Sequence, residues 1–489
     1  MSGDADLKLD NYVSNQRDIG SSLCISNCRL FITVGVFEPC KQKNYISGRE
    51  LRSKSQNDTV RQYDLATYPV QLRQAFGMKQ AFQNKEWVAH ENSIVHLKLS
   101  AKWRDENGEH IANQHIEKFN VWRDSGLLPD AIKKDILHQG VGCGRQHRFK
   151  PGELIPAWDP ELLKTIPVKN FTGRLKNGEQ VILRVGRFYP KGWFSGVKGI
   201  YSENMFPARV TNIENEFITI DYNHPLSRFE INLSIDIIDI FPPADEHGGR
   251  CSDAIDVLLA NGPGMQFTEN NNDTEFFVES AFSRIDQKND NEFYQTVRPV
   301  HHLDSYARQT VAKLYAQFIK PESNVLDLMA SWESHLPTKL SSVHLSCLGM
   351  NEQELSSNHD MNDYIVHDLN QNSTTPYTAN SFDAVICTAS VEYLINPLDV
   401  FNDIHRIVKP GGIFIVTFSN RFFPTKAISQ WAEMHEFERV GLVMAYFRKS
   451  QWNNSVHSFS TRGRIRPEDD PHFDKTQVSD PVFAVWCYK

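Results

Sequence analysis

Residues 325–337 read VLDLMASWESHLP. The first four residues form a short apolar run around one acid, Asp327, which is typical of a buried parallel strand that carries a carboxylate near its end. In a doubly wound sheet, ligands bind at the carboxyl ends of strands, so Asp327 stands where a binding site is expected. A nucleotide-binding loop would continue with glycines, because glycine has no Cβ and takes positive φ readily. This chain continues instead with Met329, Ala330, Ser331 and Trp332.

Segments with helix and strand patterns alternate on both sides of this stretch. YARQTVAKLYAQFI (residues 306–319) has helical spacing, and FDAVICTA (382–389) predicts a second strand. LDVFNDIHRIV (398–408) predicts a helix that stops at KPGG, and IFIVTFS (413–419) predicts a third strand. This alternation predicts a doubly wound, Rossmann-like α/β domain over residues 286–489.

Polar residues follow several of the predicted strands. VHLSCLGMNEQEL (343–355) comes about one βα unit after the first strand, where a residue that binds ribose hydroxyls is expected, and the candidate there is Asn351. DYIVHDL (363–369) predicts a strand with Asp368 at its end. Beyond FDAVICTA, the same cleft is expected to receive Ser390, Glu392 and Tyr393.

Taken together, VLDL, Asp368, FDAV, VEYL and HRIVKPGGIFIVTFSNR resemble the class I S-adenosylmethionine-dependent methyltransferases of the small type-11 group. The resemblance covers about residues 286–489. It is closer still to an uncharacterised subfamily of plants and bacteria whose first loop reads S-W-x-S-H-x-P. The segments GMNEQEL, DLN, VEYL, TFSNR and TKAIS of this chain all have counterparts in that subfamily.

The resemblance implies S-adenosylmethionine as the cofactor. Met329, Ala330 and Ser331 would lie against its methionine part, Asn351 would take the ribose and Asp368 the adenine amino group. Asp327 and Ser390 complete the expected cofactor-binding set. Two departures stand out: Trp332 leaves less room than glycine, and a neutral Asn351 accepts hydrogen bonds more weakly than the usual carboxylate.

Methyl transfer depends mainly on alignment of the acceptor, and it needs a base only when the acceptor is protonated. The predicted catalytic residues on the acceptor side are His302, Glu392 and Tyr393, with His301 and Asp304 close by in sequence. Each feature also has a structural explanation. Asp327 would then cap a strand end, Trp332 would be a core aromatic residue, and the two histidines would begin a helix.

The N-terminal half is β-rich from about residue 90 and predicts an α+β domain over residues 89–245. SGLLPDAIKKDILHQGVGCG, GELIPAWDPELLKTIPVKNF and the stretch that contains DYNHPL follow one another in order. This order resembles the FKBP-type peptidyl-prolyl cis-trans isomerases of the bacterial SlyD kind, with an inserted chaperone domain at about 160–222. The family's Asn-His turn corresponds to Asn223 and His224.

That resemblance implies prolyl isomerisation in an aromatic pocket that desolvates the imide. The lining is altered, however, because the expected polar or aromatic positions hold Leu99, Ala112, Ile155 and Leu233. Binding of a prolyl peptide or an unfolded chain would survive these losses, since exposed aromatic residues of the insert would suffice. Alternatively, Phe188, Tyr189, Trp193 and Phe194 fill a small local core.

Residues 1–88 predict a poorly defined extension, with a strand at 29–37 and a helix near 70–83, and residues 246–285 predict a linker. The net charge of −8 over 489 residues gives no reason to expect nucleic acid. Eight cysteines without a CxxC motif indicate a reducing compartment and no metal site. Without a secretory signal or a membrane-spanning stretch, the expected location is cytoplasmic.

The sequence therefore predicts a methyltransferase fused to an FKBP-like folding or peptide-binding module that would present a protein substrate. Two alternatives remain open. One is a non-catalytic scaffold with a degenerate methyltransferase fold, and the other is an active prolyl isomerase with an inert C-terminal domain.

Overall fold

The computed structural model describes residues 88–489, except 107, 143, 175–177, 179, 242–247 and 269–272. The predicted strand at 29–37 and helix near 70–83 lie outside the described residues. Among the helices that are described, none is both long and apolar enough to cross a membrane.

The C-terminal half contributes seven strands to one sheet, in the order β11-β10-β9-β12-β13-β15-β14. These strands span Asn324–Leu328 (β9), His344–Gly349 (β10), Asp363–Val366 (β11), Phe382–Thr388 (β12), Val408–Phe418 (β13), Val456–Arg462 (β14) and Val482–Tyr488 (β15). Pairing is parallel from β11 to β13, whereas β15 is antiparallel to both of its neighbours. The strand order reverses between β9 and β12, which is the switch point expected of a doubly wound sheet. The predicted Rossmann-like fold of this region is confirmed.

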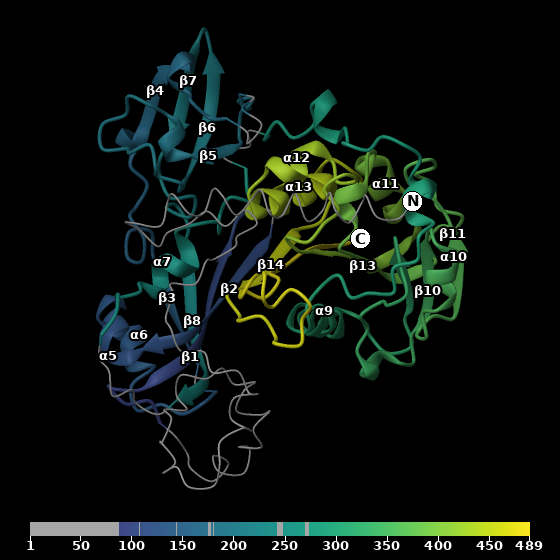
Figure 1. The fold of residues 1–489 in the computed structure, drawn as a ribbon, viewed down its shortest axis with the longest axis horizontal. Helices are drawn as coiled ribbons and strands as arrows, with labels where there is room; N and C mark the ends of the chain where they lie inside the picture. The colour runs from purple at the N-terminus through teal and green to yellow at the C-terminus, as the bar shows by residue number, and fades with distance from the viewer. Residues whose placement is uncertain are drawn as a thin grey trace, which may run out of the picture.

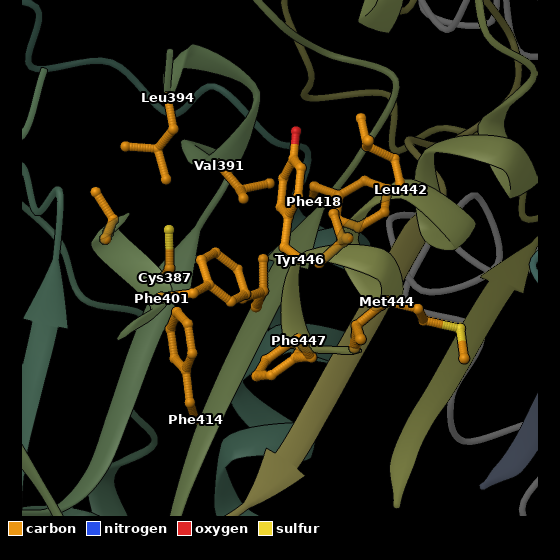
Figure 2. Packing of buried hydrophobic residues seen from close by; sticks show 14 of the residues in the cluster. Cys387, Val391, Leu394, Phe401, Phe414, Phe418, Leu442, Met444, Tyr446 and Phe447 are labelled. Atoms are coloured by element: carbon orange, nitrogen blue, oxygen red, sulfur yellow. The ribbon is translucent and has the colours of Figure 1, made fainter. Parts of the chain in front are cut away.

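Helices cover both faces of this sheet because its central strands are apolar on both sides. The helices are Asp290–Tyr294 (α8), Ser305–Phe318 (α9), Glu352–Ser356 (α10), Pro397–Ile407 (α11), Ser429–Glu433 (α12) and Glu436–Arg448 (α13). On one face, Phe401 of α11 and Phe447 of α13 pack on Phe414 of β13 (Figure 2). On the other face, Tyr315 of α9 packs in a cluster that contains Val325. The predicted helices at 306–319 and 398–408 correspond to α9 and α11.

The sheet does not stop at β14. Residues Ser458–Arg462 of β14 pair in parallel with residues His110–Gln114 of β2, and the sheet continues in the order β2-β1-β8-β3 (Figure 1). These N-terminal strands span Ile94–Arg104 (β1), Glu109–Asn120 (β2), Arg145–Phe149 (β3) and Ile231–Phe241 (β8), and they pair in antiparallel fashion. One eleven-stranded sheet therefore runs through both halves of the chain.

The N-terminal part of the sheet has its own core. Two short helices, Val121–Asp124 (α5) and Asp130–Lys134 (α6), lie between β2 and β3 in sequence. Helix α7 (Ala254–Leu259) buries Leu258 and Leu259 in the same core, although it comes from the segment predicted as a linker. Leu99, Ala112 and Leu233 are also buried there. These predicted pocket-lining residues are thus packing residues.

A second, four-stranded antiparallel sheet is inserted between β3 and β8. Its order is β4-β7-β6-β5, with strands Leu163–Pro167 (β4), Phe188–Pro190 (β5), Pro207–Glu214 (β6) and Phe217–Asp221 (β7). Phe171, Tyr189 and Phe194 form its core, and Trp193 packs against them. Phe188 belongs instead to the core of the methyltransferase-like half. The aromatic residues of the insert therefore fill cores, as the second interpretation of them expects.

A buried ion pair fixes this insert to α13. The Arg187 Nε atom lies 2.8 Å from the Glu438 Oε1 atom, and both side chains are almost fully buried. The same oxygen accepts a hydrogen bond from the backbone N–H of Phe188 at 2.8 Å. The inserted sheet, the N-terminal sheet and the C-terminal sheet are consequently held to one another through buried contacts.

Candidate functional site

The carboxyl ends of β9, β10, β11 and β12 meet at one edge of the sheet because these strands are parallel. This geometry brings the predicted residues that follow each strand to a common edge. They are Met329 after β9, Asn351 after β10, Asp368 after β11 and Ser390 after β12.

Asp327 lies beneath this edge, with 3% of its surface exposed. The hydroxyl of Ser334 donates to its carboxylate, and Ser334 in turn accepts from the Asn358 Nδ2 atom at 2.8 Å. Burial raises the pKa of Asp327 to about 7, while the bond from Ser334 opposes that rise. Asp327 and Ser334 satisfy each other inside the protein, so the structure gives Asp327 a role in supporting the loop.

The loop after β9 keeps a tight turn without glycine. Met329 has a φ of 58°, which is unusual for a residue with a side chain and costs about 1 kcal/mol or more. The Ala330 N–H donates to the Leu348 carbonyl at 2.8 Å, and a Cβ at Gly349 would lie only 2.2 Å from the Ala330 carbonyl oxygen. The loop is therefore drawn tightly against the end of β10.

Side chains hold the rest of this loop in place. The Ser331 hydroxyl donates to Glu354 at 2.6 Å, and the ring of Trp332 lies 4.8 Å from that of His301. Glu333 makes an ion pair with His301 at 2.8 Å and a weaker one with Arg308 at 3.7 Å. Partial burial raises the pKa of Glu333, but the hydrogen bond and charge of His335, together with His301 and Arg308, lower it to about 2. None of the serine hydroxyls described here is directed to an outside ligand.

Both the oxygen and the nitrogen of the Asn351 side-chain amide already make hydrogen bonds within the protein. Its oxygen caps α10 by accepting from the N–H groups of Gln353 and Glu354, and its Nδ2 atom donates to the Tyr294 carbonyl at 2.7 Å. The ribose role of Asn351 stays a prediction, and it would require some of these bonds to be exchanged.

Asp368 is half-buried and orders the turn that follows β11. Its oxygens accept from the Asn370 N–H and the Gln371 side chain, both at 2.9 Å. Asn370 then donates to Asp290 at 2.8 Å and to the Tyr393 carbonyl at 3.0 Å. Asn370 links three parts of the site and was not predicted as a site residue, although the DLN motif could have pointed to it.

The segment after β12 carries a buried carboxyl group, that of Glu392. Ala389 has a φ of 48°, and the Ser390 hydroxyl donates to the Thr388 carbonyl. Glu392 is 0% exposed, and neither of its carboxyl oxygens has a hydrogen-bond partner among the described residues. Burial raises the pKa of Glu392 to about 8, while the residue's own backbone N–H and the charge of Arg439 oppose that rise.

The other two predicted catalytic residues meet at Phe423. The Tyr393 hydroxyl oxygen accepts from the Phe423 N–H at 2.9 Å. The ring of His302, which lies at the surface, is 5.3 Å from the Phe423 ring. Tyr393 is itself buried. Phe423 therefore connects an exposed imidazole with the buried residues at the end of β12.

Residues 284–298 cross this edge and were missed by the sequence analysis as part of the site. Lys426 is 0% exposed and its Nζ atom lies 3.0 Å from both Asp286 and Asp290. Asp290 also pairs with Arg284 at 2.8 Å. The two acids and the lysine of TKAIS were visible in the sequence, but nothing in their spacing shows that they meet. In the part of the chain that the structure describes, no cluster of His, Cys, Asp and Glu could hold a metal ion.

One protein-family model matches part of the C-terminal half. Residues 338–416 match the family model described as a methyltransferase domain, a range that begins just after the loop and ends within β13. No curated protein sequence matches the chain.

Several solved methyltransferase structures are also similar, at low identity. One, from Galdieria sulphuraria and named as a sarcosine dimethylglycine methyltransferase, has 19% identity and a TM-score of 0.20, and the match covers 23% of this chain and 45% of that one. An S-adenosylmethionine-dependent methyltransferase of Thermotoga maritima has 13% identity, coverages of 39% and 91% and a TM-score of 0.28. An S-adenosylmethionine-dependent methyltransferase of Aquifex aeolicus has 14% identity and a TM-score of 0.26, and the match covers 41% of this chain and 96% of that one.

The assignment of this region rests on the strand order and on the family match. The family match leaves residues 1–337 uncovered, and the FKBP resemblance of the N-terminal half stays a prediction. The C-terminal region is a class I methyltransferase domain, an assignment that supports S-adenosylmethionine as its cofactor.

Proposed function

We propose that the C-terminal half binds S-adenosylmethionine at the carboxyl edge of β9 to β12 and methylates an acceptor from which Glu392 takes a proton. The observation that carries this proposal is the unpartnered, fully buried Glu392 at the end of β12, inside the range that matches the methyltransferase domain. A buried carboxyl without a partner is costly, so its presence beside a predicted cofactor site favours a functional role.

The residues at the edge fit the cofactor on two sides. Met329 adopts the positive φ that glycine supplies in the usual loop, so the backbone of Met329–Ser331 keeps the shape that would hold the methionine part. Asp368 is half-buried after β11, where it would accept from the adenine amino group. When bound, S-adenosylmethionine supplies a methyl group on a good leaving group.

The chain's own residues would orient the acceptor and manage its proton. Glu392 has a pKa of about 8, so both its neutral and charged forms are accessible near neutral pH. The Tyr393 oxygen already accepts from Phe423, which leaves its own hydroxyl proton free to donate. His302 lies at the surface against Phe423, where an acceptor would enter.

Isothermal titration of the full chain with S-adenosylmethionine and S-adenosylhomocysteine tests the proposal. Micromolar binding of both is expected. Absence of binding at high protein concentration would favour the non-catalytic scaffold instead.

For the N-terminal half, we propose a non-catalytic binding module of FKBP-like topology that engages a protein partner. The burial of Leu99, Ala112 and Leu233 in a core that α7 helps to close supports binding over isomerisation, because an imide would find no open pocket at these positions. In a proline-limited refolding assay, the full chain is expected not to accelerate refolding. Acceleration would restore the isomerase alternative, and failure to capture any protein partner would remove the module's proposed role.

A further inference from the structure

A pocket of about 320 Å³ lies where the inserted sheet meets the N-terminal sheet and the segment after α7. Four aromatic side chains from different segments line it: Trp158, Phe188, Phe229 and Phe267. The rings of Phe229 and Phe267 pack edge to face with centroids 4.6 Å apart. The volume suits a ligand that is the size of one large amino-acid side chain with its backbone groups.

Two guanidinium groups already lie on the aromatic walls. Arg228 lies over the Trp158 ring at 3.7 Å, and Arg209 lies over the rings of Phe188 and Phe267 at 4.5 and 5.6 Å. A cationic ligand would compete with these groups for the same ring faces. The pocket is therefore not a cage for an ammonium group.

Three acids, Asp105, Asp221 and Glu106, also line the pocket. Asp105 is paired with His110, and Asp221 accepts from the Asn223 N–H. A phosphate with two negative charges would be repelled by this many carboxylates. A ligand with a single carboxylate, or a zwitterion, agrees better with the charges present.

Arg228 is the cation that can receive such a carboxylate. Its side chain is exposed, and its guanidinium carbon lies 3.7 Å from the centre of the Trp158 ring, which holds the group at the pocket wall. A planar guanidinium donates two parallel hydrogen bonds to a carboxylate, and aromatic stacking pre-organises it for this purpose. The apolar walls next to it would take the side chain of the same ligand.

We propose that this pocket binds a carboxylate that carries a large apolar or aromatic side chain, as in a free α-amino acid or the C-terminal residue of a peptide. Arg228 binds the carboxylate, and Phe188, Phe229 and Phe267 contact the side chain. This proposal does not depend on the methyltransferase assignment.

The walls of the pocket are also bonded directly to the methyltransferase domain. The Phe188 N–H donates to Glu438 of α13. Asp105, another lining residue, contacts His110, whose Nδ1 atom lies 2.8 Å from the Ser458 hydroxyl of β14. An occupied pocket would therefore stabilise both halves of the chain together.

Titration of the full chain with N-acetyl-L-phenylalanine and with its amide, N-acetyl-L-phenylalaninamide, tests the role of the carboxylate. The acid is expected to bind at least tenfold more tightly than the amide. Arg228→Met keeps an apolar stem on Trp158 but removes the charge, so this variant should lose the preference. Arg145→Met serves as the matched control, because Arg145 is exposed on β3 and does not line the pocket.

L-phenylalanine distinguishes the two sources of the ligand. Tighter binding of L-phenylalanine than of its N-acetyl form, lost in Glu106→Gln, identifies a free amino acid. Equal or weaker binding identifies a peptide C-terminus. The proposal is overturned if the acid and the amide bind equally, if Arg228→Met binds like the wild type while melting at the same temperature, or if no probe binds at millimolar concentration.

Discussion

The ends of two neighbouring strands, β9 and β12, differ in how they treat a buried acid. After β9, Asp327 accepts from Ser334, and the loop that follows is held by paired side chains. After β12, Glu392 is buried without any hydrogen-bond partner among the described residues. Both ends share a strained residue, Met329 in one case and Ala389 in the other.

This difference distinguishes an acid that stabilises the fold from one that is available for a reaction. A polar group that is already satisfied contributes to the fold and gives nothing to a ligand unless the bond is broken. A polar group that is buried and unsatisfied lowers stability and is available to a partner that arrives later. The end of β9 therefore shapes the site, and the end of β12 is where reactivity is expected.

The largest expected effect is on stability at high pH. Glu392 holds its proton up to about pH 8 in the folded chain, against 4.5 as its ordinary value, so the folded state binds more protons between these values and stability falls as the pH rises through them. Glu392→Gln removes that fall and should be more stable than the wild type by about 5 kcal/mol at pH 9, with little difference at pH 4. Urea unfolding at both pH values measures this. The exposed Glu433→Gln is the control and should show no such difference.

Glu392→Gln should lower the methyltransferase activity, although it raises the stability at high pH. Glu392→Gln cannot accept a proton, and loss of a general base typically lowers a rate by about 100-fold or more. The measurement is transfer of a labelled methyl group from S-adenosylmethionine to acceptors in a cell extract, with S-adenosylhomocysteine affinity determined in parallel. Affinity should change less than about threefold, because the change is on the acceptor side. The wild-type rate should rise with pH towards about 8. A variant that keeps most of its rate would remove Glu392 from the chemistry.

Ser334→Ala tests the other side of the comparison. The substitution leaves Asp327 and Asn358 without their shared partner and should cost about 1 to 3 kcal/mol of unfolding free energy. Cofactor affinity should hold, since the Ser334 hydroxyl is already bonded to Asp327 and Asn358 inside the protein. Chemical unfolding and titration with S-adenosylhomocysteine check both expectations, with the exposed Ser341→Ala as control. A stable Ser334→Ala protein that no longer binds would show that the β9 loop recognises the ligand directly.

The smallest expected effect is on stability and comes from the positive φ that Met329 and Ala389 both adopt. Ala389→Gly relieves a positive φ and should raise stability by about 0.5 kcal/mol, because the relief exceeds the added flexibility of the unfolded chain. Ala384→Gly, inside β12, has no strain to lose and should lower stability by about 0.5 to 1 kcal/mol. Thermal unfolding of the pair gives the answer. Equal losses would mean that Ala389 is not strained.

Much of the C-terminal fold was predictable because its signals are local. VLDL and FDAVICTA are apolar runs of strand length, and the segments that became α9 and α11 have helical spacing. Their alternation has one common solution, a parallel sheet covered on both faces. The pairing of β14 with β2 was not predictable, because a strand pattern does not name a partner that lies 348 residues away in the chain.

The sequence predicts where the site residues lie better than it predicts what each of them does. Strand ends place Asp327, Asp368 and Glu392 at one edge of the sheet, which sequence order alone indicates. That Asn351 caps α10 and that Lys426 holds two aspartates depends on backbone directions fixed only in three dimensions. The unpartnered state of Glu392 depends on every side chain around it, and no single motif encodes that.

The pairing between β14 and β2 has a practical consequence for work with fragments. A chain cut between the two halves would expose the backbone N–H and C=O groups of both strands along a full row. Unpaired strand edges of this kind template pairing with other chains, so each fragment would tend to aggregate or to dimerise through the cut. The pairing of β14 with β2 thus makes each half depend on the other for a covered sheet edge. The methyltransferase domain expressed alone would aggregate more readily than the full chain.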